Sequence, residues 1–110
     1  MNISDRQNYI SKTFKDVHKN IFDQIKMFED KSKIQDDVWH KKELGNGNSV
    51  VIDDGNFFDK AGINFSSISG KSLPESSVGN KSKSMGLPFF ATGVSVVFHP
   101  KNPYIPTAHL

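Results

Sequence analysis

Two histidines, His99 and His109, bracket a stretch that contains Pro100, Pro103 and Pro106, and they are the side chains of this sequence best suited to chemistry. Imidazole exchanges protons near neutral pH, so histidine is a common general acid or base. The prolines fix the backbone φ angle and exclude both helix and central strand. Two interpretations stay open: a rigid loop that holds the two histidines, or an edge turn whose histidines simply lie at the surface. A spacing of ten residues matches no standard zinc pattern, and two histidines are too few for a closed zinc site.

The segment before the prolines is predicted to be a strand with two different faces. Alternation along the strand puts bulky side chains on one face: Phe90, Thr92, Val94, Val96 and Phe98. The other face carries Ser95 and His99 together with Ala91 and Gly93, whose small size leaves room for a ligand to approach the backbone. Ser95 and His99 lie ~13 Å apart along such a strand. They cannot both bind one small atom, but both can line one side of a large, flat ligand.

Residues 1–33 are predicted to form a helical N-terminus. Ser4 and Gln7 have the spacing of a capping box. Apolar residues recur at intervals of three and four and define one stripe: Ile10, Phe14, Val17, Ile21, Ile25 and Phe28. His18 falls beside this stripe and is interpreted as solvent-exposed. Acidic residues are mixed with the lysines of the polar face, which disfavours a helix lying on a membrane. The helix is therefore interpreted as packing material.

Residues 37–69 are predicted to form a meander of three antiparallel strands. The strands are placed at 38–43, 49–52 and 57–69, with turns at 45–48 and 53–56 where Gly, Asn and Asp cluster. In the third strand Phe57, Ala61, Ile63 and Phe65 are expected on one face, with Lys60, Asn64 and Ser66 on the other. Residues 70–86, rich in Ser, Gly and Lys, are predicted to be a flexible surface loop. The predicted fold class is α+β, with a helix followed by an antiparallel sheet.

Composition bounds the possible functions. A length of 110 residues allows one small domain. The net charge is +2 and Arg6 is the only arginine, which is a poor footprint for nucleic-acid binding. The absence of cysteine excludes disulfides and thiolate sites. No apolar run approaches the ~20 residues of a membrane span. A cytoplasmic protein that binds no nucleic acid is expected.

Several motifs in residues 37–109 occur in the order found in one enzyme family. In chain order they are Trp39, Gly45-x-Gly47, the run Asp54-Gly55-x-Phe57-Phe58-Asp59-Lys60-Ala61-Gly62-Ile63-Asn64-Phe65-Ser66, Leu73-Pro74, the run Phe89-Phe90-Ala91-Thr92-Gly93-Val94-Ser95, and the run His99-Pro100-Lys101-Asn102-Pro103-Tyr104-x-Pro106-Thr107-x-His109. This arrangement resembles the N-terminal half of the oxygen-dependent coproporphyrinogen oxidases. Two details depart from the family pattern: Asp59 replaces a glutamate, and His40-Lys41 replaces a pair that ends in arginine.

The resemblance implies a fold, a reaction and site residues. It implies a larger antiparallel sheet flanked by helices, and a homodimer. It implies that coproporphyrinogen III is converted to protoporphyrinogen IX in haem biosynthesis, with molecular oxygen as co-substrate, no organic cofactor, and two propionates decarboxylated to vinyl groups. By motif, Ser95 resembles the substrate-contacting serine and His109 the proton donor. His99 and His109 together resemble a pair of ligands for a divalent metal ion.

The resemblance also implies that residues 1–110 are one part of that domain, with an active-site strand and Pro-rich loop at 87–110. Such a fragment is expected to be inactive by itself. Two other classes stay open from the sequence. One is a non-catalytic remnant that binds porphyrinogen or a partner. The other is an unrelated small β-domain that binds carbohydrate or peptide over Ala91 and Gly93.

Overall fold

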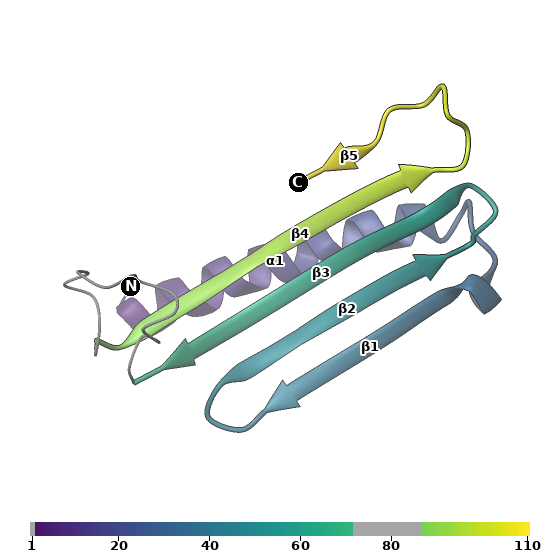
Figure 1. Ribbon diagram of the computed structural model, residues 1–110. Helices are drawn as coiled ribbons and strands as arrows, with labels where there is room; N and C mark the ends of the chain where they lie inside the picture. Colours follow the sequence, from purple (N-terminus) through teal and green to yellow (C-terminus); the bar gives the residue numbers. More distant parts are fainter. Residues whose placement is uncertain (1, 72–86) are drawn as a thin grey trace.

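One helix lies across one face of a five-stranded antiparallel sheet (Figure 1). The computed structural model describes residues 2–71 and 87–110. The elements are α1 (Ile3–Ile25), the short 3-10 helix η1 (Lys31–Lys33), β1 (Ile34–Lys41), β2 (Gly45–Asp53), β3 (Phe58–Gly70), β4 (Phe89–Pro100) and β5 (Ala108–His109). The strand order is β1-β2-β3-β4-β5, so every strand pairs with its neighbour in the sequence. The predicted α+β class is confirmed.

Two further expectations concern a surface loop and membrane spans. The loop predicted at 70–86 lies outside the described residues except for its first two, of which Gly70 ends β3. Within the described ranges, no helix has the length and apolar character needed to cross a membrane.

Helix α1 begins at a different cap from the one predicted. The Oδ1 atom of Asn2 accepts a hydrogen bond from the amide of Asp5 at 2.7 Å, and this makes Asn2 the N-cap. Ser4 lies inside the first turn, so the predicted capping box with Gln7 is wrong. Asparagine and serine cap helices about equally well. The choice of Asn2 adds Ile3 and Ser4 to the hydrogen-bonded helix.

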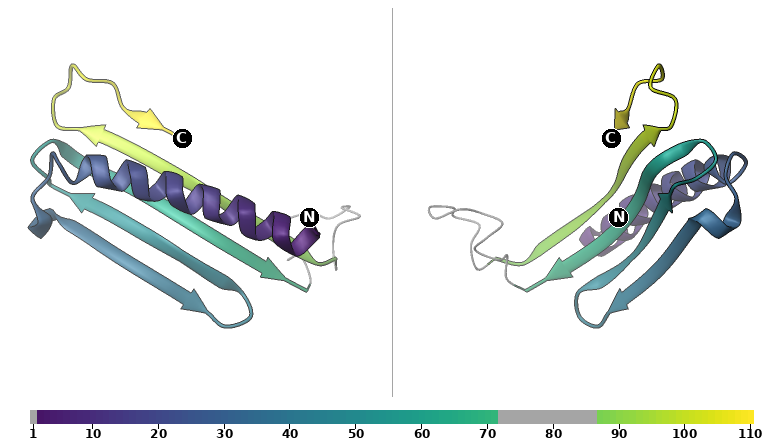
Figure 2. Two further views of the ribbon diagram at one scale, coloured as in Figure 1. Left: turned by 180° about the vertical axis from the view of Figure 1, so that it is seen from behind. Right: turned by 45° about the vertical axis from the view of Figure 1, so that its right-hand side comes forward.

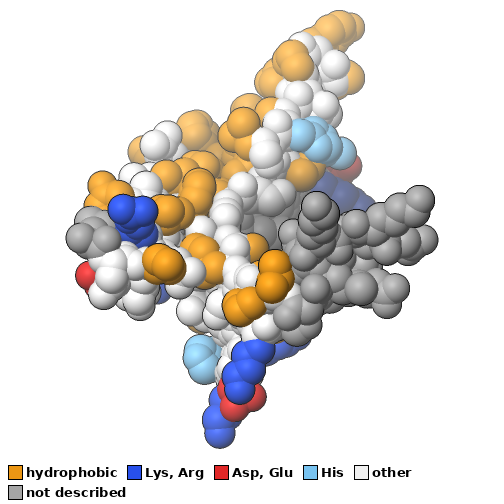
Figure 3. All heavy atoms as spheres, turned by 90° about the vertical axis from the view of Figure 1, so that its left-hand side faces the viewer, with side chains coloured by type: hydrophobic (Ala, Val, Ile, Leu, Met, Phe, Trp, Pro, Cys, Tyr) orange, Lys and Arg blue, Asp and Glu red, His pale blue; other side chains and the backbone are white. Residues whose placement is uncertain are grey.

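The face of α1 that packs on the sheet is rotated from the predicted apolar stripe. Phe22 and Ile25 are buried as part of the core, whereas Ile10, Val17 and Phe28 of the predicted stripe are exposed. Other apolar residues of the helix, Ile3 and Tyr9, are exposed as well. Figure 3, a view of the side that lies on the left in Figure 1, shows hydrophobic side chains on the molecular surface. The periodicity located the helix but not its buried face.

His18 accounts for the rotation, because it is buried at 3% exposure and not solvated as predicted. Its Nε2 atom lies 2.9 Å from the carbonyl oxygen of Ile63 on β3. Its ring also lies between those of Phe22 and Phe65, with a centroid distance of 6.4 Å to each. A polar ring can be buried when it has a hydrogen-bond partner. A hydropathy pattern counts histidine as polar and cannot foresee such a partner.

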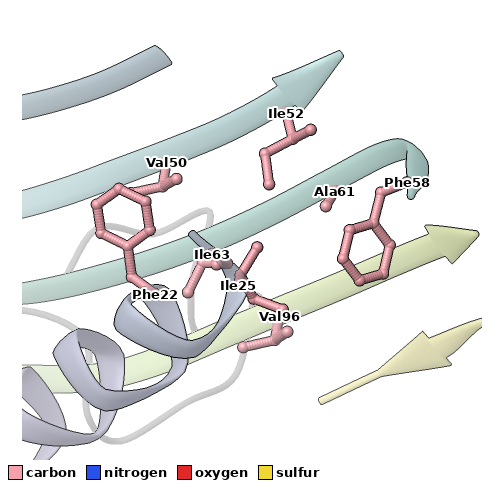
Figure 4. Packing of buried hydrophobic residues seen from close by; sticks show 8 residues of the cluster. All are labelled: Phe22, Ile25, Val50, Ile52, Phe58, Ala61, Ile63 and Val96. Atoms are coloured by element: carbon pink, nitrogen blue, oxygen red, sulfur yellow. The ribbon is translucent and has the colours of Figure 1, made fainter. Parts of the chain in front are cut away.

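The core lies between α1 and the face of the sheet that the helix covers. Figure 4 shows its side chains, which come from the helix and from β2, β3 and β4: Phe22, Ile25, Val50, Ile52, Phe58, Ala61, Ile63 and Val96. Phe65 is also buried, and Val94 and Phe98 pack against the cluster. In β3 the buried Ala61, Ile63 and Phe65 alternate with the less buried Gly62 and Asn64, and in β4 the buried Val96 follows the exposed Ser95, as expected for strands with one covered face.

The first hairpin turn lies three residues earlier than predicted. The turn is at residues 42–44, where Glu43 takes a left-handed φ of 67°. The predicted turn residues 45–48 instead begin β2. A Cβ on Gly47 would lie 2.5 Å from the ring of Trp39, and one on Gly45 would lie 1.9 Å from the carbonyl oxygen of Ser67. These glycines therefore serve close packing within the sheet rather than a turn.

The start of β3 also departs from the simple alternation. Phe57, predicted on the same face as Ala61 and Ile63, is 40% exposed, whereas its neighbour Phe58 is buried with them. The pairing of β3 with β4 is irregular between Phe58 and Lys60. Such a bulge shifts which residues face the core. Beyond it, Ala61, Ile63 and Phe65 share one face as predicted, and that face is buried.

Glu29 connects the end of the helical region to the turn between β2 and β3. The residue is 7% exposed. Its Oε1 atom accepts hydrogen bonds from the amides of Phe57 and Phe58, both at 2.8 Å. Its Oε2 atom accepts from the amide of Asn56. A Cβ on Gly55 would meet this carboxylate, so glycine is required there. One acidic side chain thus satisfies three consecutive turn amides.

We predict that Glu29→Gln lowers the free energy of unfolding by about 1–3 kcal/mol, because an uncharged amide cannot accept all three bonds and directs an NH₂ group at an N–H donor. Glu43→Gln, in the exposed first turn, is the matched control and should change stability by less than about 0.5 kcal/mol. Urea unfolding followed by circular dichroism measures both. Equal stabilities for the two variants would show that the Glu29 contacts contribute little.

Candidate active-site face

The face of the sheet opposite α1 is uncovered in the described part of the chain, and we call it the open face (Figure 2). The register pairs Ser95 with Asn64 and His99 with Lys60, so these four residues lie on the same face. Ser95 is exposed, and Val96, which points the other way, is 1% exposed. The prediction that Ser95 and His99 share a face opposite the bulky residues of β4 is therefore confirmed.

The centre of the open face has room above the backbone. A hollow of about 280 Å³ is lined by Asn64 and Ser66 of β3 and by residues 91–95 of β4. A Cβ added to Gly62 or to Gly93 would meet nothing within 4 Å. Packing within the described structure therefore does not require glycine at these two positions. Their small size keeps the surface flat, as expected where a planar ligand lies close to a sheet.

His99 and His109 meet at the edge of the open face. Residues 101–107 turn the chain back, and β5 pairs His109 with Val97 and Ala108 with Phe98. His109 is thus diagonal to His99, and the two Nε2 atoms lie 3.4 Å apart. The stretch between them thus brings the two histidines together, and it does so at an edge of the sheet, where His109 is exposed. Sequence reasoning did not foresee β5, which is a short edge strand, where prolines nearby are tolerated.

Lys101 fastens this loop to the turn between β2 and β3. Its amide donates to the carbonyl of Phe57 at 3.0 Å, and its Nζ lies 2.8 Å from Oδ1 of Asp54. The hydrogen bond from Lys101 holds the pKa of the Asp54 carboxyl below its usual value. The same bond raises the pKa of Lys101. This pair was not singled out from the sequence, where its members are 47 residues apart.

The two histidines supply part of what a metal ion needs. Two imidazole nitrogens bound at about 2.0–2.1 Å to one tetrahedral ion would be roughly 3.4 Å apart, which agrees with the Nε2 separation. Two nitrogens are half of a tetrahedral ligand set, however. Among residues 2–71 and 87–110, no group of three or more His, Cys, Asp or Glu side chains is placed to hold an ion. The described residues do not make a metal site by themselves.

Comparison of the sequence with known proteins points to one family. The family described as "Coproporphyrinogen III oxidase" matches residues 9–110. A protein of Prochlorococcus marinus strain MIT 9515, named oxygen-dependent coproporphyrinogen-III oxidase, is 43% identical over 94 residues, which is 86% of this chain and 28% of that protein. A protein of the same name from strain AS9601 is 48% identical over 80 residues, 73% of this chain and 23% of that protein.

The region of this chain that contains the sheet, the open face and the paired histidines thus matches a family of oxidases. The chain belongs to the coproporphyrinogen III oxidase family. It spans about a quarter of the length of the relatives that it matches. The match includes both histidines, Ser95 and the strands that position them. It thereby excludes the alternative of an unrelated β-domain.

We predict a pH-dependent contribution of the Lys101–Asp54 pair to stability. The folded pKa of Asp54 is lowered, so the stabilisation is present above the unfolded value of about 3.9 and is lost as the pH falls through the folded pKa. Lys101→Met should therefore be less stable than the wild type at neutral pH, and this gap should close in acid. Lys15→Met, an exposed change on α1, is the control and should show no such gap. Urea unfolding at a series of pH values tests this; a gap that persists below the folded pKa would contradict it.

Proposed function

We propose that the open face forms one wall of the substrate site of a coproporphyrinogen III oxidase. The observation that carries this proposal is the contact between His99 and His109 on the face that also presents Ser95. The flat, small-residue surface around Gly62 and Gly93 suits a macrocycle. The relatives' name, oxygen-dependent coproporphyrinogen-III oxidase, supports both the substrate and dioxygen as co-substrate.

In this proposal the reaction balances without an organic cofactor. Each reacting propionate loses its carboxylate as carbon dioxide and one hydrogen from the carbon chain. Two electrons and one proton leave per vinyl group formed. Dioxygen takes up both electrons, this proton and one further proton, which gives hydrogen peroxide. The chain's residues would bind the ring and handle protons. His109 donates a proton, Ser95 forms a hydrogen bond to the substrate, and His99 orients the imidazole of His109 through their contact.

Location, oligomeric state and metal binding are further properties of the proposed enzyme. A homodimer is implied by the family resemblance and a cytoplasmic location is expected from the composition; both stay predictions. A divalent metal at His99 and His109 also stays a prediction, and no step above depends on it. The alternative of a non-catalytic, porphyrinogen-binding remnant differs from an enzyme in turnover and not in binding.

We predict that coproporphyrin III, the air-stable oxidised tetracarboxylate, quenches the fluorescence of the single tryptophan, Trp39. Trp39 belongs to the open face, because the register places it in line with Gly47, Ser66 and Gly93. Gly93→Leu should weaken binding at least about tenfold, because its side chain would occupy the space of the ligand. Folding should tolerate it, since a Cβ there meets nothing.

The matched control is Ser69→Leu, which adds the same side chain to an exposed position on the covered face of β3. It should leave quenching unchanged. Equal binding by both leucine variants would place the porphyrin elsewhere, and no quenching of the wild type would contradict the proposed site.

A second prediction concerns turnover. The 110 residues alone should form no vinyl product above the autoxidation blank, because the open face covers one side of the ring and positions it loosely. Fusion to the remaining part of a Prochlorococcus marinus relative should give an active enzyme. In that fusion His109→Ala should lower kcat by about 100-fold or more, with a smaller effect on KM.

His40→Ala, on an exposed part of β1, is the control and should retain activity. The assay admits air to the reduced substrate and separates vinyl products by chromatography. A fully active His109→Ala fusion would remove the proton-donor role, and product from the 110 residues alone would contradict the expected loss of positioning. A fusion that folds and binds porphyrin without turnover would favour the non-catalytic alternative.

A further inference from the structure

We infer that Lys60 binds a carboxylate group of the macrocycle at the end of the open face occupied by His99. This inference rests on the proposed function. Lys60 lies directly opposite His99 in the register, and both side chains leave the sheet on the same side. Four residues further along each strand lie Asn64 and Ser95, ~13 Å away. A charged position at one end of the open face is thus followed, beyond Gly62 and Val97, by a neutral polar pair that lines the central hollow.

The distribution of charge singles out Lys60. The open-face positions of β3 and β4 are residues 60, 62, 64, 66, 68 and 70 and residues 89, 91, 93, 95, 97 and 99. They include no carboxylate, and Lys60 is the one lysine among them. The acidic residues of this face lie on the other half of the sheet, Asp37 on β1 and Asp53 on β2. The β1–β2 half also carries Lys41 beside Trp39, so its two carboxylates and one lysine leave it with a net negative charge. An anionic ligand is therefore favoured on the β3–β4 half, where Lys60 is the charged residue.

The ammonium group of Lys60 is available to a ligand. The ion pairs found among residues 2–71 and 87–110 do not include it. Lys60 lines a hollow of about 410 Å³ with Asp53, Val51 and Gly62. Asp53 is the nearest competing anion by register, since it lies on β2 and pairs with Lys60 across the edge of β3 that faces away from β4. A propionate that reaches Lys60 would thus meet one attractive and one repulsive group.

The side chain of Lys60 and the backbone of Gly62 indicate which part of the ligand binds here. A lysine ammonium is a compact charge that attracts one carboxylate without the fixed orientation of an arginine fork. The Gly62 backbone beside it leaves the ring free to lie flat. Lys60 therefore selects for a carboxylate-bearing edge of the macrocycle next to His99. The neutral pair, Ser95 and Asn64, would face the pyrrole nitrogens or an uncharged edge of the macrocycle.

The test measures coproporphyrin III binding by quenching of Trp39 for Lys60→Met, Asp53→Asn and Lys15→Met. Lys60→Met should weaken binding about two- to fivefold at low salt, as expected for one exposed charge pair. Asp53→Asn should strengthen binding by a similar factor. Lys15→Met removes the same charge from α1, on the other side of the sheet, and should leave binding unchanged. The effect of Lys60→Met should shrink at high salt because exposed charges are screened.

The outcomes separate this inference from the proposed function. If the wild type binds and Lys60→Met binds equally well, the assignment of Lys60 is wrong and the proposed site stands. An effect of Lys60→Met that is unchanged at high salt, or matched by Lys15→Met, also overturns it. Absence of quenching in the wild type overturns both. Asp53→Asn removes the carboxylate that is paired with Lys60 across the strands. Binding that this variant does not strengthen would also count against the assignment, so the inference stays testable even if Lys60→Met proves unstable.

Discussion

The register between β3 and β4 is the constraint on which both faces of the sheet depend. It sets Ile63 beside Val96 under the helix and, one residue along, sets Asn64 beside Ser95 on the open face. Side chains alternate along a strand, so a slip by one residue would exchange the two sets. The buried pair opposes such a slip because it would expose side chains that are now fully covered. The apolar core thus fixes the position of every polar residue of the candidate site, although none of them belongs to that core.

A second fixed point lies where the turn between β2 and β3 meets the loop of the histidines. Glu29 accepts hydrogen bonds from three amides of this turn, and Lys101 bonds to its Phe57 carbonyl and to Asp54. The turn is therefore held from the helical side and from the loop side at once. Since the same loop carries the chain from His99 to His109, the contact between the two imidazoles depends on groups that lie away from the open face. Residues from three separate parts of the sequence cooperate at this corner of the molecule.

Local patterns in the sequence sufficed for the helix, the alternation of β4 and the face shared by Ser95 and His99, because period and side-chain size are visible along the chain. They failed where a distant partner decides. His18 is buried because the Ile63 carbonyl is available to it, and Gly47 lies in a strand because the Trp39 ring covers it. The bulge after Phe58 moved Phe57 off the face expected for it. The proximity of His99 and His109 depends on a two-residue edge strand, too short to have a periodic signal of its own. The family motifs contained both histidines but not the distance between them.

The order of the elements has a consequence for synthesis on the ribosome. Among these elements helix α1 is synthesised first. It packs against β3 and β4, which are synthesised after β1 and β2. Each strand can pair with the one before it as soon as it emerges, because sequence neighbours are also sheet neighbours. The helix has to wait for the later strands before it can bury Phe22 and Ile25. Helices gain most of their stability from such packing. A growing hairpin array with an undocked amphipathic helix is therefore the species that the cell's chaperones would encounter, and completion of β4 is the step that closes the core.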